Sequence, residues 1–422
     1  MIHTDKKINV LSLFSGCGGM DLGFEGDFNV LKQSVNLKVN SNWNVSETNN
    51  DSWIHLEKNI FHTIFANDIK PDAKKAWTNY FAKKGIDSNT YKLGSIVDLV
   101  KEAKFEKKVF PQHVKIDIIT GGFPCQDFSI SGKRKGLNSD KNHMGEIKEN
   151  STPNVENRGQ LYIWMKEVIS IIKPKMFIAE NVKGLVSLSN IKQIIEDDFR
   201  SICSGGYLVV EAKLLQAADY GVPQSRERIF FFGFKKSALT NSAINELSKP
   251  TISKDFDPYP PKTHSYTQNS DKNLLPPVTA FDAFVGLEEP DFSSDLSQQK
   301  YSKAKFMGKH CQGQNEVNLL EVSPTIRSEH HGNIEYRRLS KENGGKNIKE
   351  LESGLVERRL TVRECARLQT FPDDYQFVCK GNKNEKGISA SSSYKLIGNA
   401  VPPLLAYNIA KHLENNWSKY FK

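Results

Sequence analysis

The stretch that decides the fold runs from Ile116 to Leu137 and reads IDIITGGFPCQDFSISGKRKGL. Ile116, Ile118 and Ile119 form a short β-branched apolar run that Gly121-Gly122 ends, which predicts a buried parallel strand entering a loop. Pro124 then fixes the approach to Cys125. A cysteine just beyond the carboxyl end of a central strand lies where open α/β sheets gather ligands and chemistry, and this place suits a nucleophile.

The alternative for Cys125 is a buried structural thiol, which is the commoner role of a lone cysteine in a cytosolic chain. Its neighbours are polar or cationic: Gln126, Asp127, Ser129, Lys133, Arg134 and Lys135. Such a loop does not bury a thiol, and nearby Lys and Arg side chains favour the thiolate. The surroundings therefore favour a reactive cysteine.

These residues carry a family resemblance. Pro124-Cys125-Gln126, followed by Phe128-Ser129 and Gly132, resembles the nucleophile loop of DNA (cytosine-5)-methyltransferases, and further motifs of that family follow in order from Phe14 to Pro402. The resemblance implies an α/β fold, the Rossmann-like fold of S-adenosylmethionine-dependent methyltransferases, with a mixed, mostly parallel sheet and a smaller irregular target-recognition domain. It also implies that Gln126, Ser129, Lys133 and Arg134 touch DNA.

Length and composition agree with such an enzyme. The chain has 422 residues, enough for two or three domains, and 38% of them are hydrophobic. It has neither a membrane-spanning apolar run nor a signal-peptide core, so we expect a cytoplasmic protein. Six cysteines lack CxxC spacing, which predicts neither disulfides nor a zinc site. The net charge of +9 is compatible with a polyanionic partner.

The amino-terminal segment predicts a strand, a tight turn and a helix. Ile8 to Phe14 alternates apolar residues, and Ser15-Gly16-Cys17-Gly18-Gly19 turns the chain toward a helix beginning near Met20. Glycines let the backbone approach a ligand closely at a helix amino terminus. The resemblance assigns Phe14, Gly16, Gly18 and Gly19 to S-adenosylmethionine binding.

Two further strand ends belong to the same expected site. Ile64 to Ala66 resembles the second strand, and the resemblance makes Asp68 the acceptor for the ribose hydroxyls, with Ile69 beside it. The alternative is that Asp68 caps the helix starting near Pro71. Gly94-Ser95-Ile96 lies where the family usually has Gly-Asp-Ile, so Ser95 and Ile96 are expected at the cofactor but Ser95 brings no charge.

The segment Lys175 to Asn181, KMFIAEN, predicts another buried strand that ends in a carboxylate. The resemblance makes Glu180 a catalytic partner of Cys125, and a helix cap is the alternative. Gln224, Arg226 and Arg228 alternate, so they share one face if the chain is extended. A solvated or salt-bridged edge is the ordinary interpretation. The family's QxRxR element instead places Arg226 and Arg228 in the active site, one near the cytosine O2, and Gln224 at the DNA.

We expect three parts in the chain. Residues 1–233 form the catalytic and cofactor-binding domain, with insertions at about 27–60 and 138–156; residues 234–356 form the target-recognition domain; residues 357–422 return to the catalytic domain. The middle part has equal numbers of basic and acidic residues, so the excess positive charge lies elsewhere.

Within the middle part, Arg327, His330, His331 and Asn333 are groups able to contact base edges. The same residues also suit an ordinary polar loop, or a metal site that lacks partners. Near the end of the chain, Thr361 to Glu364 is a capping box that opens a helix. Asn399 and Val401 precede another helix, and in the family they complete the cofactor pocket.

The expected reaction is methyl transfer from S-adenosylmethionine to C5 of a flipped-out cytosine in double-stranded DNA, through a covalent bond between Cys125 and C6. No metal is expected. A tRNA methyltransferase shares much of this pattern, but the long span 234–356 favours DNA. An inactive DNA-binding module is a further alternative, which Cys125 and Glu180 disfavour. We expect a bacterial, monomeric enzyme paired in the cell with a cognate restriction endonuclease.

Overall fold

The computed structural model describes residues 7–106, 109–124, 161–186, 190–203, 205–267, 271–302, 316–328, 334–337, 345–381 and 386–422. None of the helices within them has the length and apolar character needed to cross a lipid bilayer.

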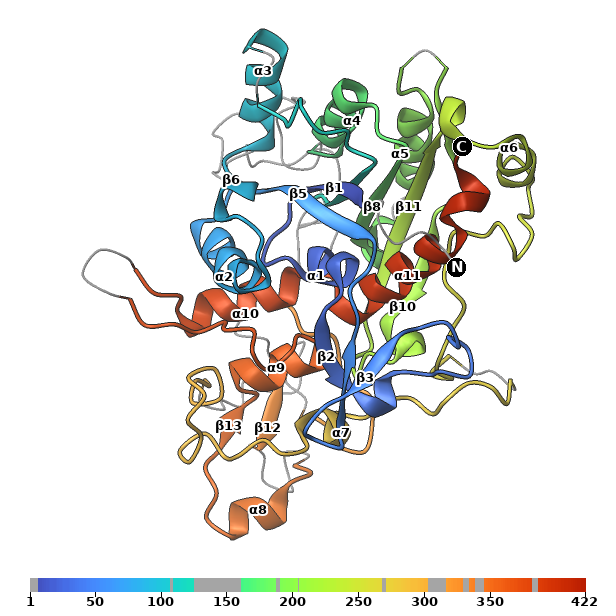
Figure 1. Cartoon of the computed structure of the whole chain (residues 1–422). Helices are drawn as coiled ribbons and strands as arrows, with labels where there is room; N and C mark the ends of the chain where they lie inside the picture. The colour runs from blue at the N-terminus through green and yellow to red at the C-terminus, as the bar shows by residue number, and fades with distance from the viewer. Residues whose placement is uncertain are drawn as a thin grey trace.

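An eight-stranded mixed sheet forms the centre of the described structure (Figure 1). Seven strands follow one another in the order β10 (Lys213–Gln216), β11 (Glu227–Lys235), β8 (Met176–Val182), β7 (Ile118–Gly122), β1 (Ile8–Leu13), β5 (Phe61–Asp68) and β6 (Tyr91–Leu93). A further strand, β9 (Tyr207–Val209), pairs with the end of β11. The strands from β8 to β6 run parallel, whereas β11 is antiparallel to β8. The predicted fold class is confirmed.

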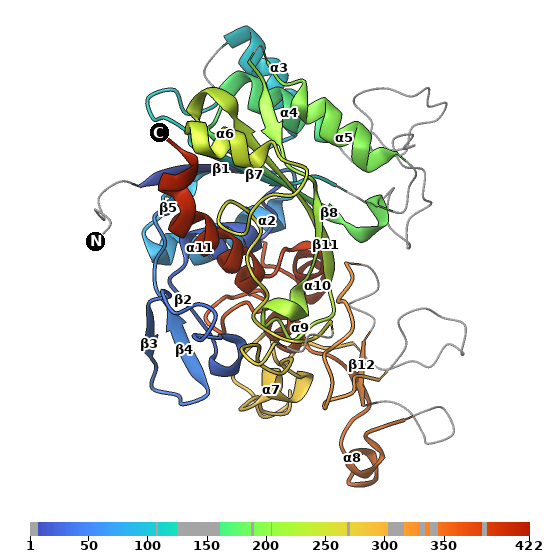
Figure 2. The same ribbon diagram turned by 90° about the vertical axis from the view of Figure 1, so that its right-hand side faces the viewer.

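Successive side chains of the central strands enter two different cores, because strand residues alternate between the faces of a sheet. In β8, Met176 and Ile178 belong to one buried cluster and Phe177 and Ala179 to the other. Helices therefore cover both faces, as a buried parallel sheet requires (Figures 1 and 2). One face carries α3 (Ile96–Glu106), α4 (Leu161–Ile172) and α5 (Ile191–Arg200). The other carries α1 (Gly19–Glu25), α2 (Pro71–Phe81) and α11 (Pro403–Tyr420).

The predicted buried parallel strand before Cys125 is confirmed as β7, which ends at Gly122 and includes both glycines. Gly121 pairs with Leu13 and Ala179, and Gly122 pairs with Glu180. A Cβ atom at Gly122 would lie 2.8 Å from Glu180 Oε2. Gly122 therefore lets the Glu180 carboxylate lie close to the β7 backbone at the end of the strand.

The segment 27–60 forms a small antiparallel sheet of its own, in the order β2 (Phe28–Leu31), β4 (Trp53–Leu56) and β3 (Val45–Glu47). It packs on the carboxyl-terminal helix through aromatic contacts. The ring centroids of Trp43 and Tyr407 lie 4.8 Å apart, and those of Phe28 and Tyr407 lie 5.8 Å apart.

Described parts of the span 234–356 contain little regular structure: α6 (Asn241–Leu247), α7 (Ala280–Phe284), β12 (Glu335–Arg337) and α8 (Ile348–Glu352). β12 pairs with β13 (Arg358–Arg359), which leads into α9 (Val362–Leu368). The predicted capping box at Thr361 and Glu364 is confirmed. Asn399 is the last residue of α10 (Ala390–Asn399), so it ends one helix and does not directly open the next.

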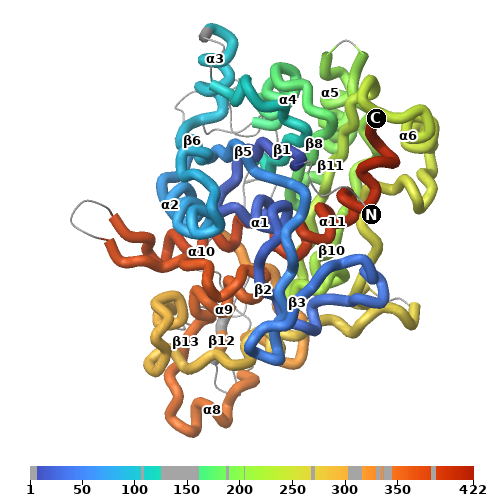
Figure 3. Tube along the Cα trace, in the orientation of Figure 1, coloured from blue at the N-terminus to red at the C-terminus, as the bar shows by residue number. Residues whose placement is uncertain are grey.

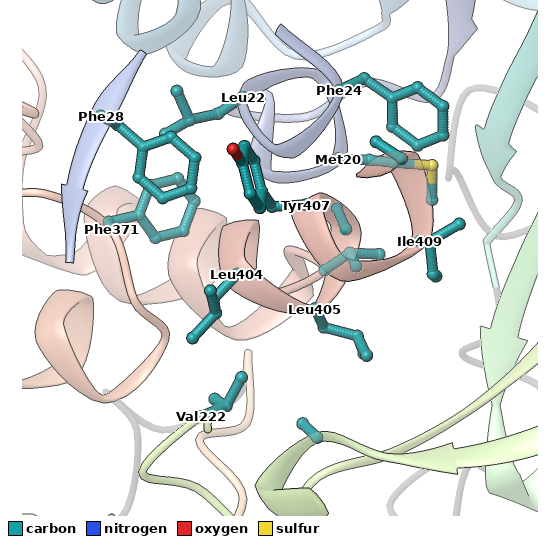
Figure 4. Close-up of a cluster of buried hydrophobic side chains, with 14 of the residues drawn as sticks. Met20, Leu22, Phe24, Phe28, Val222, Phe371, Leu404, Leu405, Tyr407 and Ile409 are labelled. Atoms are coloured by element: carbon teal, nitrogen blue, oxygen red, sulfur yellow. The ribbon is translucent and has the colours of Figure 1, made fainter. Parts of the chain in front are cut away.

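The two ends of the chain meet in the core. Figure 3 shows α1 beside α11, and Figure 4 shows side chains such as Met20, Leu22 and Tyr407 packing between them. A Cβ atom at Gly23 would lie 2.5 Å from the carbonyl oxygen of Pro403, so glycine allows the two helices to approach. The start of α11 thereby comes close to the Gly-rich turn.

Candidate active site

The carboxyl ends of β1, β5, β7 and β8 open into a cavity of about 690 Å³. This volume lies within the range of small-molecule and cofactor sites. The lining residues come from 12–17, 19–20, 67–71, 94–96, 121–124, 161, 180–184, 227–228, 325–328, 396 and 398–401. Segments more than 300 residues apart in sequence thus share one site.

The Gly-rich turn forms one wall of this cavity. No atom lies within 4 Å of the place that a Cβ atom at Gly16 would occupy, so its backbone faces open space. Gly19 is different, because a Cβ atom there would lie 2.2 Å from the carbonyl oxygen of Val401. The turn therefore exposes its backbone at Gly16 and packs on the carboxyl-terminal segment at Gly19.

Asp68 connects the tip of β5 to this turn. Its Oδ2 accepts a hydrogen bond of 3.1 Å from the Gly16 N–H, and its Oδ1 accepts one of 3.0 Å from the Lys70 N–H. The N-cap residue of α2 is Lys70, and its side chain makes no capping hydrogen bond. Asp68 is thus not the N-cap of that helix, and its carboxylate lines the cavity.

Most residues predicted for the cofactor lie on this side of the cavity. Those lining it are Phe14, Gly16, Gly19, Asp68, Ile69, Ser95, Ile96, Asn399 and Val401. Ser95 is buried, and its Oγ accepts a hydrogen bond of 3.3 Å from the Val97 N–H. Gly18 is the exception, because it faces the ring of Trp77 on the other side of the turn.

The opposite end of the cavity contains a buried ion pair. Glu180 is only 7% exposed, and its Oε1 lies 2.9 Å from Arg228 Nε. Burial raises the pKa of the Glu180 carboxyl, and the positive charges of Arg228 and Arg226 lower it by a smaller amount. A carboxyl group with a raised pKa beside a cation is suited to exchanging a proton with a polar ligand.

Comparison with known proteins decides the family. The family model of the C-5 cytosine-specific DNA methylase matches residues 8–415. The chain belongs to this family.

Among individual relatives of this methylase, the Type II methyltransferase M.BsuRI of Bacillus subtilis is 32% identical over 98% of the chain and 80% of that protein. M.BspRI of Lysinibacillus sphaericus is 31% identical over 100% of the chain and 84% of that protein. Among solved structures, S. pombe Dnmt2 methyltransferase has a TM-score of 0.55 at 17% identity, covering 97% of this chain and 99% of that one. Entamoeba histolytica EhMeth has a TM-score of 0.55 at 14% identity, covering 98% and 99%. These two structures support the fold alone.

In this methylase the two arginines of the QxRxR element do not share one environment. Arg228 lines the cavity, whereas Arg226 is 0% exposed and lies behind the wall. Its Nη1 donates to the Ile326 carbonyl at 3.0 Å, and its Nη2 donates to the Gly398 and Ala400 carbonyls at 2.8 and 2.9 Å. Arg226 therefore joins two segments of the cavity wall.

Gln224, expected at the DNA, is likewise in the interior and 0% exposed. Its Nε2 donates to the Leu368 carbonyl and to Gln369 Oε1, and its Oε1 accepts from the Ile326 N–H at 2.9 Å. A fully buried side chain with these partners does not contact DNA. Arg327, by contrast, is half-buried and lines the cavity.

Several predicted site residues lie outside the described residues. They are Cys125, Gln126, Ser129, Lys133, Arg134, His330, His331 and Asn333. Their proposed roles remain predictions. Pro124, directly before Cys125, lines the cavity at the end of β7.

Asn181, Thr325 and Ile326 also line the cavity, although they were not among the predicted site residues. Asn181 had a signal, because it follows Glu180 at the end of the same strand, and its Nδ2 donates to the Phe123 carbonyl at 3.2 Å. Thr325 and Ile326 had no comparable signal for the cavity, because a bridge between Gln224 and Ser323, which are far apart in sequence, brings them there. Within the described ranges, no group of three or more His, Cys, Asp or Glu residues is placed to hold a metal ion.

Proposed function

We propose that this protein transfers a methyl group from S-adenosylmethionine to C5 of a cytosine in double-stranded DNA, with Cys125 forming a covalent bond to C6. The supporting observation is the position of Glu180. Its buried carboxylate pairs with Arg228 and lies opposite Gly122, three residues before Cys125, in the same cavity as the Gly-rich turn. One cavity thus holds the catalytic acid beside the strand that leads to the nucleophile.

The cofactor end of the cavity fits S-adenosylmethionine. Backbone that faces open space at Gly16 suits close contact with a ligand, and the Asp68 carboxylate suits a pair of ribose hydroxyls. Phe14, Ile69, Ile96 and Val401 provide apolar surface for an adenine ring. When bound, S-adenosylmethionine supplies an electrophilic methyl group.

The other end of the cavity provides what cytosine needs. C5 of cytosine is a poor nucleophile, so addition of the Cys125 thiolate at C6 is required to make C5 reactive. Glu180 holds the base at N3 and the 4-amino group and supplies a proton to the ring as charge develops, and Arg228 holds O2. After C5 is methylated, loss of its proton and breaking of the Cys125–C6 bond restore the ring.

A stacked base does not reach these residues, because Glu180 lies at the end of a strand inside the protein. The target nucleotide is therefore flipped out of the duplex, at a cost of a few kcal/mol. Residues 234–356 select the sequence, and the catalytic parts on either side perform the transfer. This enzyme acts as a monomer, and it protects host DNA from a cognate restriction endonuclease, as the Type II names of its relatives suggest.

The test uses purified protein, labelled S-adenosylmethionine, and either duplex DNA or tRNA. Wild-type protein is expected to label DNA, Cys125→Ser to label nothing while still binding the cofactor, and Cys203→Ser to behave as wild type. Bisulfite sequencing of the labelled DNA then locates the modified cytosine. Labelling of tRNA alone, or wild-type turnover by Cys125→Ser, would refute this proposal.

A further inference from the structure

Asp21 is a buried carboxylate beneath the Gly-rich turn that the proposed reaction does not use. It lies in α1, is 1% exposed, and is not among the residues that line the cavity. Within the part of the chain that the structure describes, its hydrogen-bond donors are Ser12 and Trp77, which are both neutral. Burying a carboxylate without a cation costs free energy of folding, so we expect Asp21 to have a role beneath the turn.

On one side, Asp21 ends a chain of hydrogen bonds that runs along the cavity wall. Ser12 Oγ donates to Asp21 Oδ1 at 2.5 Å, and Ser15 Oγ lies 2.8 Å from Ser12 Oγ and 3.1 Å from the Ser12 carbonyl. The Asn67 N–H in turn donates to Ser15 Oγ at 3.1 Å. Because an ionised carboxylate only accepts, Asp21 fixes the direction in which Ser12 donates and leaves the Ser12 oxygen free to accept from Ser15.

On the other side, Asp21 holds the ring of Trp77 against the turn. Trp77 Nε1 donates to Asp21 Oδ2 at 2.7 Å. A Cβ atom at Gly18 would lie 2.5 Å from Trp77 Cδ1, so the indole occupies the space directly behind Gly18, whose φ is 77°. One carboxylate thus contacts both supports of the turn.

We propose that Asp21 is a positioning residue that fixes the Gly-rich turn in its cofactor-binding shape, through Ser12 and Ser15 on one side and Trp77 on the other. This inference rests on the proposed use of S-adenosylmethionine. Burial raises the pKa of Asp21 to about 6, and its two hydrogen bonds lower it by less, so the carboxylate is ionised at neutral pH. Asparagine at this position keeps the volume, but its amide nitrogen is a donor and does not accept from either neighbour.

The experiment measures binding of S-adenosylhomocysteine by calorimetry, which is independent of methyl transfer. Asp21→Asn and Ser12→Ala are each expected to raise the dissociation constant about ten-fold, as for loss of a hydrogen bond to a charged group. The matched control is Glu25→Gln, which removes a carboxylate from the same helix one turn away and is expected to bind as wild type. The affinity for DNA is expected to stay within two-fold in all three variants.

Thermal unfolding of each variant separates positioning from general loss of structure. Weak binding by Asp21→Asn with a melting temperature no lower than that of wild type supports the inference. If Asp21→Asn is unstable, Ser12→Ala decides, and wild-type affinity in that variant overturns the inference. Wild-type affinity in a folded Asp21→Asn variant also overturns it. A wild-type protein that does not bind S-adenosylhomocysteine would instead refute the proposed function.

Discussion

Asp21, behind the Gly-rich turn, and Glu180, in the cavity wall, are buried carboxylates that are stabilised differently. Asp21 accepts hydrogen bonds from two neutral donors and is sealed behind the Gly-rich turn, whereas Glu180 pairs with Arg228 and faces the cavity. Burial raises the pKa of both groups, but only Glu180 has cations beside it. The comparison shows that a sealed carboxylate can order its neighbours, while one that faces a cavity can also exchange a proton with a ligand.

The largest expected effect distinguishes these two roles directly. Glu180→Gln is expected to lower the single-turnover rate of methyl transfer by about 10²–10⁴-fold, because it removes a proton donor that acts in the transition state. Its affinity for S-adenosylhomocysteine should not change. Asp21→Asn should bind S-adenosylhomocysteine more weakly than wild type but transfer the methyl group at the wild-type rate when the cofactor is saturating. An unchanged rate in Glu180→Gln would reduce that residue to a structural cap.

Substitutions of Arg226 and Arg228 are expected to affect the stability of the protein differently. Arg226→Met leaves the carbonyls of Ile326, Gly398 and Ala400 without their donor, and we expect a loss of about 3 kcal/mol. Because Arg226 lowers the pKa of Glu180 less than Arg228 does, this loss should change less between pH 5 and pH 8 than the loss in Arg228→Met. Arg228→Met instead leaves Glu180 buried without its nearest cation, so the pKa of Glu180 in the folded protein rises further.

Proton linkage makes the stability of Arg228→Met depend on pH. The folded state then holds a proton that the unfolded state has released, and stability falls as pH increases. The deficit of Arg228→Met should therefore be larger at pH 8 than at pH 5. Urea unfolding of both variants at the two pH values tests this, and equal deficits at both pH values for Arg228→Met would contradict it.

Asp21 provides a third test, in which stability and binding move in opposite directions. Its pKa is about 6 in the folded protein against a reference value of 3.8. The folded state therefore holds the proton more tightly, and wild type should lose about 2 kcal/mol relative to Asp21→Asn as pH rises from 4.5 to 8. Denaturant unfolding at pH 4.5 and pH 8 measures the difference. A constant difference between the two proteins would show that Asp21 is not desolvated in this way.

The smallest expected effect concerns Arg327, which lines the cavity in a segment that Arg226 holds. Arg327→Ala should weaken discrimination at one base position by about 1–3 kcal/mol if the side chain reads a base edge. If it contacts a phosphate, binding should fall equally on all sequences and the salt slope should shrink by about one. Binding to cognate and single-mismatch duplexes at two salt concentrations separates these results. Unchanged binding would remove Arg327 from the interface.

The sequence predicted those parts of the site that lie on regular strands. The apolar runs ending at Phe14, Asp68 and Glu180 are β1, β5 and β8, and their carboxyl ends meet in one cavity because parallel strands end at the same edge of a sheet. Local spacing and the order of motifs were sufficient there. Side-chain alternation also explains why helices cover both faces.

Prediction failed where contacts between distant segments decide the outcome. Gln224, Arg226 and Arg228 alternate in sequence, but only Arg228 belongs to β11, and the chain before it bonds to Ser323, Ile326 and Gly398. The surroundings of Gln224 and Arg226 are therefore set by contacts with distant segments, which the spacing alone does not reveal. The strands within 27–60 are three or four residues long, too short to produce a clear period in the sequence.

The contact between the Gly-rich turn and the carboxyl-terminal segment has a consequence for synthesis. Cys17 Sγ meets the Leu396 carbonyl across 379 residues of chain, and Gly19 packs on Val401. At about 5–20 residues per second, a ribosome needs roughly 20–75 s to make the stretch between them. The cavity wall that the Gly-rich turn and the carboxyl-terminal segment form together therefore cannot assemble early in synthesis. Each new molecule can begin methylation only after translation has passed Val401.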